Sequence, residues 1–264
     1  MFYNNKVVWI TGASSGIGEA ICYELVKQNA KVIISSNQKD DLQKVKEECI
    51  KLNKDCYIQY LDLLNTEHID EITKNIIEKF GRIDILINNA GISQRALTKD
   101  TPISIDRKIF EINYFGTVAI SKSVLPYMLK QKSGFIAATS SISGKFGFPL
   151  RSAYAASKHA ICGFFETLRA EVYNDNIKVL IAFPGRVKTD ISKHALTKDG
   201  TSHNKMDDGQ NFGISAEKCA KKYIRAIQKD KKEVLIGGKE LLMVYIKKYL
   251  PKLFYKLARK IKTN

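Results

Sequence analysis

Short apolar runs alternate with longer amphipathic stretches along most of the chain. Runs such as KVIIS, IDILIN and VLIAF are apolar throughout, which is typical of parallel strands that helices cover on both faces. The alternation predicts one doubly wound α/β domain with a seven-stranded parallel sheet flanked by helices. The expected strands are 6–11, 31–36, 55–60, 84–88, 134–139, 177–183 and 233–236. The expected helices are 16–29, 39–53, 66–80, 102–112, 114–131, 152–174 and 215–229.

A glycine-rich turn follows the first expected strand. Lys6 to Ile10 runs directly into TGASSGIG at 11–18. Gly12 allows a tight turn, Gly16 lets backbone N–H groups approach an anion, and Gly18 lets the next helix pack closely. The spacing departs from G-x-G-x-x-G, and a plain strand-to-helix turn is the alternative. The strand–turn–helix context favours a Rossmann-type nucleotide site, where the helix dipole attracts a pyrophosphate.

Three polar residues further along form a candidate catalytic set. Tyr154 and Lys158 stand four residues apart and share a helix face, and Ser141 precedes the tyrosine by thirteen residues. A neighbouring ammonium lowers the pKa of a phenol from its usual value near ~10, which suits a general acid/base at neutral pH. An isolated Tyr-x-x-x-Lys is most often ordinary helix surface, so the prediction needs the rest of the chain.

From Lys6 to about Gly237 the chain resembles the classical short-chain dehydrogenase/reductase family. The run GRIDILINNAGISQRAL and the basic carboxyl end are similar to the branch of orphan dehydrogenase/reductases that includes member 7. The resemblance implies an oxidoreductase that transfers a hydride between a nicotinamide and an alcohol or carbonyl substrate. The signature pieces occur in order as TGASSGIG at 11–18, Asp62-Leu63, NNAG at 88–91, Asn113, Ser141, YAASK at 154–158, Pro184-Gly185, Val187 and Thr189.

The resemblance also implies roles for four catalytic residues. Tyr154 exchanges a proton with the substrate oxygen, and Ser141 stabilises that oxygen as negative charge grows. Lys158 lowers the pKa of the tyrosine and binds the nicotinamide ribose. Asn113 holds a water that links Lys158 to solvent, although a local helix break or cap also explains an asparagine there.

The implied cofactor site follows the ends of the strands. Asp62 would accept a hydrogen bond from adenine, but an aspartate that caps the next helix fits equally well. Val187 and Thr189 would contact the nicotinamide amide. The full expected set comprises Gly12, Ser14, Ser15, Gly16, Ile17, Gly18, Ser36, Asn37, Asp62, Leu63, Asn89, Ala90, Gly91, Tyr154, Lys158, Pro184, Gly185, Val187 and Thr189.

The end of the second expected strand bears on the choice of cofactor. An acid there would bind ribose hydroxyls and select NAD, whereas an arginine would accept a 2′-phosphate and select NADP. Here Ser36 replaces the acid and Asn37 stands where an arginine is common, with Lys39 close behind. The missing acid favours NADP(H) over NAD(H), and a dual preference stays open.

Composition and charge bear on the partners, metal content and cellular location of the protein. The net charge of +16 comes mostly from lysine, which suits a solvated surface or contact with polyanions, anionic lipid or phosphorylated ligands. We find no helix-turn-helix, zinc or stacking-aromatic signature, so no nucleic-acid partner is expected. The five cysteines lack a CxxC pair and the four histidines lack metal-ligand spacing, so we expect reduced thiols and no metal. With no signal peptide and no uncharged run of about 18 residues, we expect a cytoplasmic protein.

Residues 239–264 are expected to form a basic amphipathic helical extension of the domain that spans 1–238. The extension has eight basic residues and one acid, and Pro251 should kink or restart its helix. Such a helix can lie peripherally on the inner face of an anionic membrane, or dock on its own protein or on another subunit. The helices at 114–131 and 152–174 resemble the family's dimer interface, so a homodimer or homotetramer is expected.

The sequence says least about the substrate. The polar segment Ile191 to Asn211 is expected to be either a mobile lid or a surface loop. Phe146, Phe148, Pro149 and Leu150 form either loop packing or an apolar wall, which would suit a hydrophobic alcohol or ketone. The alternative function is a catalytically silent cofactor-binding sensor or scaffold. An intact Ser141, Tyr154, Lys158 and Asn113 argue against it.

Overall fold

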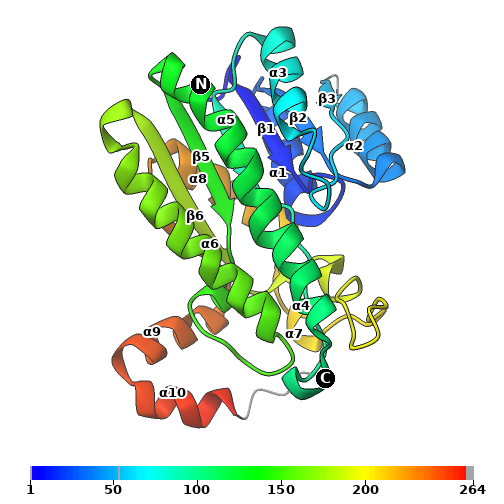
Figure 1. Cartoon of the computed structure of the whole chain (residues 1–264), viewed down its shortest axis with the longest axis vertical. Coiled ribbons are helices and arrows are strands. Elements are labelled where there is room, and N and C mark those ends of the chain that lie inside the picture. Colours follow the sequence, from blue (N-terminus) through cyan, green and yellow to red (C-terminus); the bar gives the residue numbers. More distant parts are fainter. Residues whose placement is uncertain (1, 53, 260–264) are drawn as a thin grey trace.

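The computed structural model describes residues 2–52 and 54–259. Within them, seven parallel strands form one sheet in the order β3-β2-β1-β4-β5-β6-β9, with helices on both faces (Figure 1). This arrangement confirms the predicted doubly wound α/β fold. The strand order reverses between β1 and β4, which creates the crevice where ligands bind in such sheets. The strands are β1 Val7–Thr11, β2 Lys31–Ser35, β3 Cys56–Ile58, β4 Ile85–Asn88, β5 Gly134–Thr139, β6 Ile177–Pro184 and β9 Glu233–Ile236.

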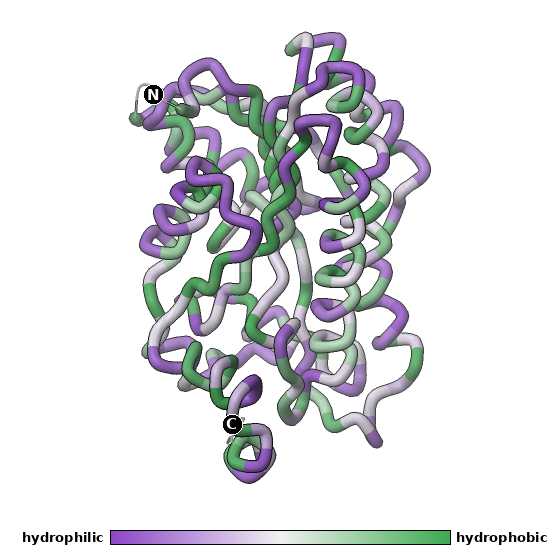
Figure 2. Tube along the Cα trace, turned by 90° about the vertical axis from the view of Figure 1, so that its left-hand side faces the viewer, coloured by the Kyte–Doolittle hydropathy of each residue, from purple (hydrophilic) through white to green (hydrophobic). Residues whose placement is uncertain are grey.

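Two hydrophobic layers hold the sheet between its helices. Alternation along β1 shows both, because Val8 and Ile10 join one layer while Val7 and Trp9 join the other. The central strands are accordingly apolar along their length (Figure 2). The first layer lies under α1 Gly16–Val26, α2 Lys39–Lys51 and α8 Ala216–Gln228. The second lies under α3 Ile69–Phe80, α5 Thr117–Gln131 and α6 Ser152–Glu171.

Several predicted boundaries were too long. The expected helix 16–29 stops at Val26, because the chain turns at Asn29, which has a left-handed φ of 60°. The expected strand 55–60 is only three residues long and forms the sheet edge. The expected helices 102–112 and 114–131 are one continuous run, in which α4 Ile103–Phe110 joins α5 through a π-helical segment, Glu111–Gly116.

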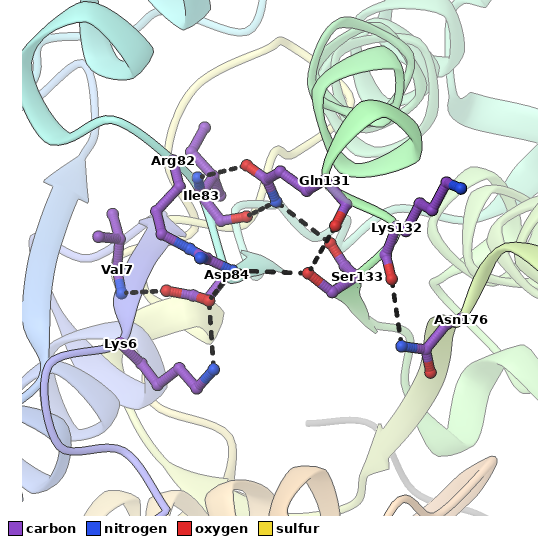
Figure 3. A network of polar contacts seen from close by, with 9 residues as sticks. All are labelled: Lys6, Val7, Arg82, Ile83, Asp84, Gln131, Lys132, Ser133 and Asn176. Carbon is purple, nitrogen blue, oxygen red and sulfur yellow. Dashed lines mark hydrogen bonds and ion pairs between the residues drawn. The ribbon is translucent and has the colours of Figure 1, made fainter.

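A polar network closes the sheet at the amino ends of its strands (Figure 3). The buried Asp84 carboxylate accepts hydrogen bonds from the Val7 backbone N–H at 2.9 Å and from Lys6 Nζ at 3.2 Å. It also pairs with Arg82 Nη2 at 2.9 Å. Gln131 at the end of α5 donates to the Ile83 carbonyl at 3.1 Å. These contacts fasten β1, β4 and α5 at the end of the sheet opposite the carboxyl ends of the strands.

The carboxyl-terminal part contains small elements that were not predicted from the sequence. β7 Val187–Lys188 pairs with β8 Ile214–Ser215, and the short α7 spans Asp208–Asn211. Within the described residues, β9 is followed by the α-helices α9 Leu242–Tyr249 and α10 Pro251–Ala258. Pro251 opens α10, which confirms the predicted restart.

The helices α9 and α10 project below the body of the domain (Figure 1). Their apolar inner side packs around Phe254 on Ile142 and Phe146, so one face docks on the protein itself. Around α10 apolar and hydrophilic residues alternate (Figure 2). Residues 260–264 of the expected extension lie outside the described residues. Across the described chain, we find no helix with the length and apolar character needed to cross a bilayer.

Candidate active site

A cleft of about 620 Å³ opens at the carboxyl ends of the central strands. Its walls come from segments that are far apart in sequence, from the first glycine turn to the loop after β6. Gly18 and Asn113 are absent from the described lining and lie behind it. The predicted residues that line the cleft are Gly12, Ser14, Ser15, Gly16, Ile17, Ser36, Asn37, Asp62, Leu63, Asn89, Ala90, Gly91, Ser141, Tyr154, Lys158, Pro184, Gly185, Val187 and Thr189.

The glycine turn at one end of the cleft needs its glycines. Gly12 and Gly16 have left-handed φ angles of 63° and 61°. A Cβ on Gly12 would lie 2.6 Å from the Ala90 Cα, and a Cβ on Gly18 would collide with the Gly12 carbonyl. Among the described residues, no side chain caps the helix that begins after Ser15. The first N–H groups of α1 are therefore available to an anion.

The residues after β4 support this turn. The Thr11 hydroxyl accepts hydrogen bonds from the backbone N–H groups of Asn89 at 3.0 Å and Ala90 at 3.1 Å. The Asn89 side chain donates to the Gly12 carbonyl at 3.1 Å. The expected cofactor residues Asn89 and Ala90 thus also fix the backbone of β1 against that of β4.

The end of β2 lies beside the glycine turn. Ser14 Oγ donates to Ser36 Oγ at 2.9 Å, and the Ser36 hydroxyl also accepts from the Gln38 N–H at 3.1 Å. Lys39 does not line the cleft; its Nζ lies 4.7 Å from the centre of the Tyr60 ring. Instead, Asp41 contributes to the wall. Its carboxylate pairs with Lys44 Nζ at 2.8 Å.

The expectation that Asp62 caps the next helix is wrong, because that helix, α3, begins after His68. The Asp62 carboxylate accepts a hydrogen bond from the Leu64 N–H at 3.0 Å, which is the local turn contact of an aspartate. The same residue lines the cleft beside Leu63. Its second carboxylate oxygen has capacity for a further donor.

The three expected catalytic side chains meet at the other end of the cleft. Ser141 Oγ accepts from the Ser143 N–H at 3.1 Å and donates to the Pro184 carbonyl at 3.4 Å. Lys158 Nζ donates to the Thr139 carbonyl at 2.9 Å and lies 5.8 Å from the centre of the Tyr154 ring. The helix α6 carries the tyrosine and the lysine, and the end of β5 leads into the serine.

The proton affinity of Tyr154 differs from the expectation. Burial raises the pKa of Tyr154 above its ordinary value, and the hydrogen bond with Ser141 only partly offsets this. The opposing positive charges come from Arg95 and Arg151, whereas Lys158 is directed at the Thr139 carbonyl. The prediction of a phenol made acidic by Lys158 is therefore wrong for this structure, because desolvation outweighs the nearby charges.

Comparison with known proteins identifies the family. A family model described as short chain dehydrogenase matches residues 6–200. The chain belongs to the short chain dehydrogenase family. Dehydrogenase/reductase SDR family protein 7-like from Anopheles gambiae is 42% identical and aligns with 89% of this chain and 75% of its own. Member 7 from Homo sapiens is 38% identical, covering 94% and 75%.

A solved structure supports the fold of this short chain dehydrogenase. The Burkholderia phymatum short chain dehydrogenase/reductase, crystallised in complex with NAD, has a TM-score of 0.83 and covers 96% of both chains at 21% identity. The family model and the two curated relatives confirm the predicted family and its member 7 branch. The protein is an oxidoreductase that acts on CH–OH or C=O groups, and its family uses NAD(P)(H).

In this short chain dehydrogenase Asn113 lies in the π-helical segment behind the cleft. The segment widens the helix where α4 meets α5, as π-bulges often do at functional sites. Asn113 Oδ1 accepts from the Ile92 N–H at 2.8 Å, and its Nδ2 donates to Ser157 Oγ at 3.0 Å. A Cβ on Gly91 would lie 3.0 Å from Asn113 Oδ1 and 3.2 Å from Lys158 Nζ. The structure thus brings Asn113 and Lys158 together at Gly91.

Lys158 predicts a specific dependence of stability on pH. Burial lowers its pKa from 10.5 to about 8. Between these two values the unfolded chain binds more protons than the folded protein, so this group makes the free energy of unfolding rise with pH. The full rise is on the order of 3 kcal/mol. We expect Lys158→Met to lack it, which urea denaturation of both proteins at pH 7.5 and 10 measures. Equal pH dependence in the two proteins would contradict the buried lysine.

The sequence analysis missed a buried ion cluster beside Tyr154. Asp207 accepts from Arg95 Nε at 3.0 Å and from Arg151 Nη2 at 2.6 Å. The Arg151 guanidinium also lies 4.6 Å from the centre of the Phe148 ring. Two cations share one carboxylate, so one positive charge stays uncompensated within the cluster. An arginine three residues before the expected catalytic tyrosine was the available signal.

Backbone strain accompanies this cluster. Leu150, directly before Arg151, has a left-handed φ of 66°, which costs free energy for a residue with a Cβ. Its carbonyl accepts a hydrogen bond from the Ala96 N–H at 3.3 Å. The loop before α6 is thereby fixed to the segment that carries Arg95.

The expected lid segment packs over the same region. Ala195 and Leu196 are buried. Leu196 forms an isolated parallel β-bridge with Gln94, in the segment after β4. Ile191, at the start of the segment, lines the cleft. The structure supports loop packing rather than an apolar wall for Phe146, Phe148, Pro149 and Leu150. They are absent from the described lining, and Phe146 packs on Phe254 of α10.

Proposed function

We propose that the protein is an NADP(H)-dependent oxidoreductase that interconverts an alcohol and a carbonyl compound, with Tyr154 as general acid/base. One observation carries the proposal, namely that a single cleft brings the glycine turn together with Ser141, Tyr154 and Lys158. A nucleotide site alone would need only the first half of that cleft. A proton donor beside it suits matched transfer of a hydride and a proton.

The shape of the cleft fits a dinucleotide. The uncapped start of α1 and the close approach at Gly12 suit a pyrophosphate. Asp62 and Leu63 would hold the adenine end, and Val187 and Thr189 the nicotinamide end. When bound, the cofactor supplies hydride exchange at its nicotinamide ring. The remaining chemistry belongs to the side chains of this chain.

The pKa of Tyr154 indicates the direction in which its proton is ready to move. A phenol with a raised pKa is protonated at neutral pH and can donate to a carbonyl oxygen. Ser141, which lines the same cleft, would donate a hydrogen bond to that oxygen and stabilise its negative charge. The fields of Arg95 and Arg151 would favour the phenolate once the proton has left. Asn113, close to Lys158, would hold the water through which the proton returns.

The preference for NADP(H) rests on the end of β2. The hydroxyls of Ser14 and Ser36 face each other at 2.9 Å, where an acid would repel a 2′-phosphate. Lys39 lies over Tyr60 and would have to move to reach such a phosphate. Asp41, whose charge is paired with Lys44, leaves little net charge in the wall.

A cofactor titration combined with a substrate panel tests this function. We expect NADPH to bind at least tenfold more tightly than NADH, and NADPH absorbance to fall with some members of a panel of apolar aldehydes and ketones. Ser36→Asp should reverse the preference by placing a carboxylate at the ribose. Tighter NADH binding to the wild type would overturn the NADP(H) assignment. Tight binding without turnover across the panel would favour the sensor alternative.

We also propose that residues 239–264 are an extension of the catalytic domain 1–238 rather than a separate unit. The packing of Phe254 against Phe146, next to the loop after Ser141, supports this. The outer side of α9 and α10 exposes Leu242, Tyr249, Leu253 and other apolar residues among lysines, which supports contact with an anionic membrane surface. Homo-oligomer formation through α5 and α6 is proposed from the family resemblance.

A further inference from the structure

Three cysteines from three separate elements meet beneath the adenosine side of the sheet. Cys22 lies in α1, Cys49 in α2 and Cys56 in β3. All three are buried, and their sulfur atoms all lie within 4.8 Å of one another. The two other cysteines, Cys162 and Cys219, are buried as well but do not join the group.

The sulfur geometry indicates neighbouring thiols rather than a disulfide. The Sγ atoms of Cys22 and Cys49 are 3.7 Å apart, far beyond a sulfur–sulfur bond of about 2.05 Å. Three sulfurs at such spacings can surround one small ion that bonds to each of them. Ordinary core packing would put aliphatic side chains at this position, whereas here three cysteine sulfurs meet.

The burial of the group separates it from the reactive redox cysteines of other proteins. A thiolate in an apolar interior is costly unless a cation neutralises it. Reactive redox cysteines are typically solvent-accessible, whereas Cys22 and Cys49 are 0% exposed.

We propose that Cys22, Cys49 and Cys56 form a trigonal thiolate site for a soft monovalent metal ion, Cu(I). Within residues 2–52 and 54–259, no histidine or acidic side chain joins the group as a fourth ligand. Structural zinc takes four ligands, so three sulfurs alone suit Cu(I) better. Binding of Cu(I) displaces thiol protons, which are released to solvent, so the affinity depends on pH.

The position of β3 provides an entry path. It is the edge strand of the sheet, and Cys56 is the one of the three with measurable exposure, at 4%. The three ligands belong to elements that flank the adenosine half of the cleft, because α1 follows the glycine turn and α2 follows Asn37. A bound ion would therefore cross-link this part of the fold independently of turnover.

Anaerobic titration of the reduced full chain with Cu(I), buffered by a chromophoric chelator, tests the site. We expect one equivalent to bind, with thiolate-to-metal absorption in the ultraviolet and an affinity that rises with pH. Cys49→Ala should weaken Cu(I) binding on the order of 100-fold or more. Removing a direct ligand costs more metal affinity than removing a residue that only hydrogen-bonds to a ligand. Cys219→Ala, which removes a buried thiol outside the group, should bind like the wild type.

Thermal unfolding provides a second readout. One equivalent of Cu(I) should raise the Tm of the wild type and of Cys219→Ala but not that of Cys49→Ala. Should Cys49→Ala fail to fold by circular dichroism, Cys56→Ser at the sheet edge replaces it. Binding that survives both substitutions, or that is lost in Cys219→Ala, would overturn the proposal.

Discussion

Replacing Tyr154 with phenylalanine should lower kcat by about a thousandfold while leaving NADPH affinity within about twofold. The substitution removes only the hydroxyl that hydrogen-bonds with Ser141. The ring stays in α6 and the cleft keeps its shape. Without that proton donor, negative charge on the substrate oxygen has no acid to neutralise it. Steady-state rates from NADPH absorbance and a parallel binding titration separate the two quantities.

Tyr173 offers a matched control for this substitution. It is 79% exposed, so Tyr173→Phe removes a hydroxyl that solvent already satisfies. We expect its kcat to equal that of the wild type. A Tyr154→Phe protein with unchanged kcat would show that another group donates the proton. Parallel loss of NADPH binding would show instead that the hydroxyl shapes the cofactor site.

Replacing Asp207 with asparagine should destabilise the fold by on the order of 3–5 kcal/mol, the cost of breaking a buried pair. Burial opposes ionisation of Asp207, but the hydrogen bonds and charges of Arg95 and Arg151 hold its pKa below the ordinary value. In the variant two buried guanidinium groups lose their shared carboxylate. The segment 191–211 also loses its ionic contact with the body of the domain.

The same substitution should change the pH profile in a defined direction. The arginines already lower the pKa of Tyr154 against the effect of burial, and without Asp207 their field at the phenol is stronger. Because carbonyl reduction needs the protonated phenol, the decline of kcat/KM at high pH should begin at a lower pH. Asp199→Asn, an exposed position in the same segment, is the control and should change neither stability nor profile. An unshifted decline would exclude an electrostatic link between the cluster and Tyr154.

The backbone framework was predictable because its signals are local. Apolar runs located the parallel strands, and the glycines at 12, 16 and 18 located the turn at the end of β1. The residues expected around the cofactor do line one cleft, with Gly18 behind it. Their expected places follow from topology, since parallel strands present their carboxyl ends along one edge.

The electrostatic balance at Tyr154 was not predictable, because it depends on contacts across the chain. Arg95 and Asp207 are 112 residues apart, and only folding reveals that they neutralise each other. The i, i+4 spacing indicated Lys158 as the charge that acts on the phenol, but the side chain turns to the Thr139 carbonyl. The cluster of three cysteines was not predicted for the same reason, because Cys22, Cys49 and Cys56 form no sequence motif.

The most direct test follows the hydrogen atom itself. NADPH carrying deuterium at either of the two C4 positions would be incubated with the best carbonyl of the panel, and the product alcohol analysed by mass spectrometry. Because Val187, Thr189 and Tyr154 all line this cleft and would fix the orientation of the ring, we expect a single ring face to be used. One labelled form should therefore transfer its deuterium to the carbinol carbon and the other should not. Product alcohol without deuterium from either form would contradict hydride transfer in this cleft.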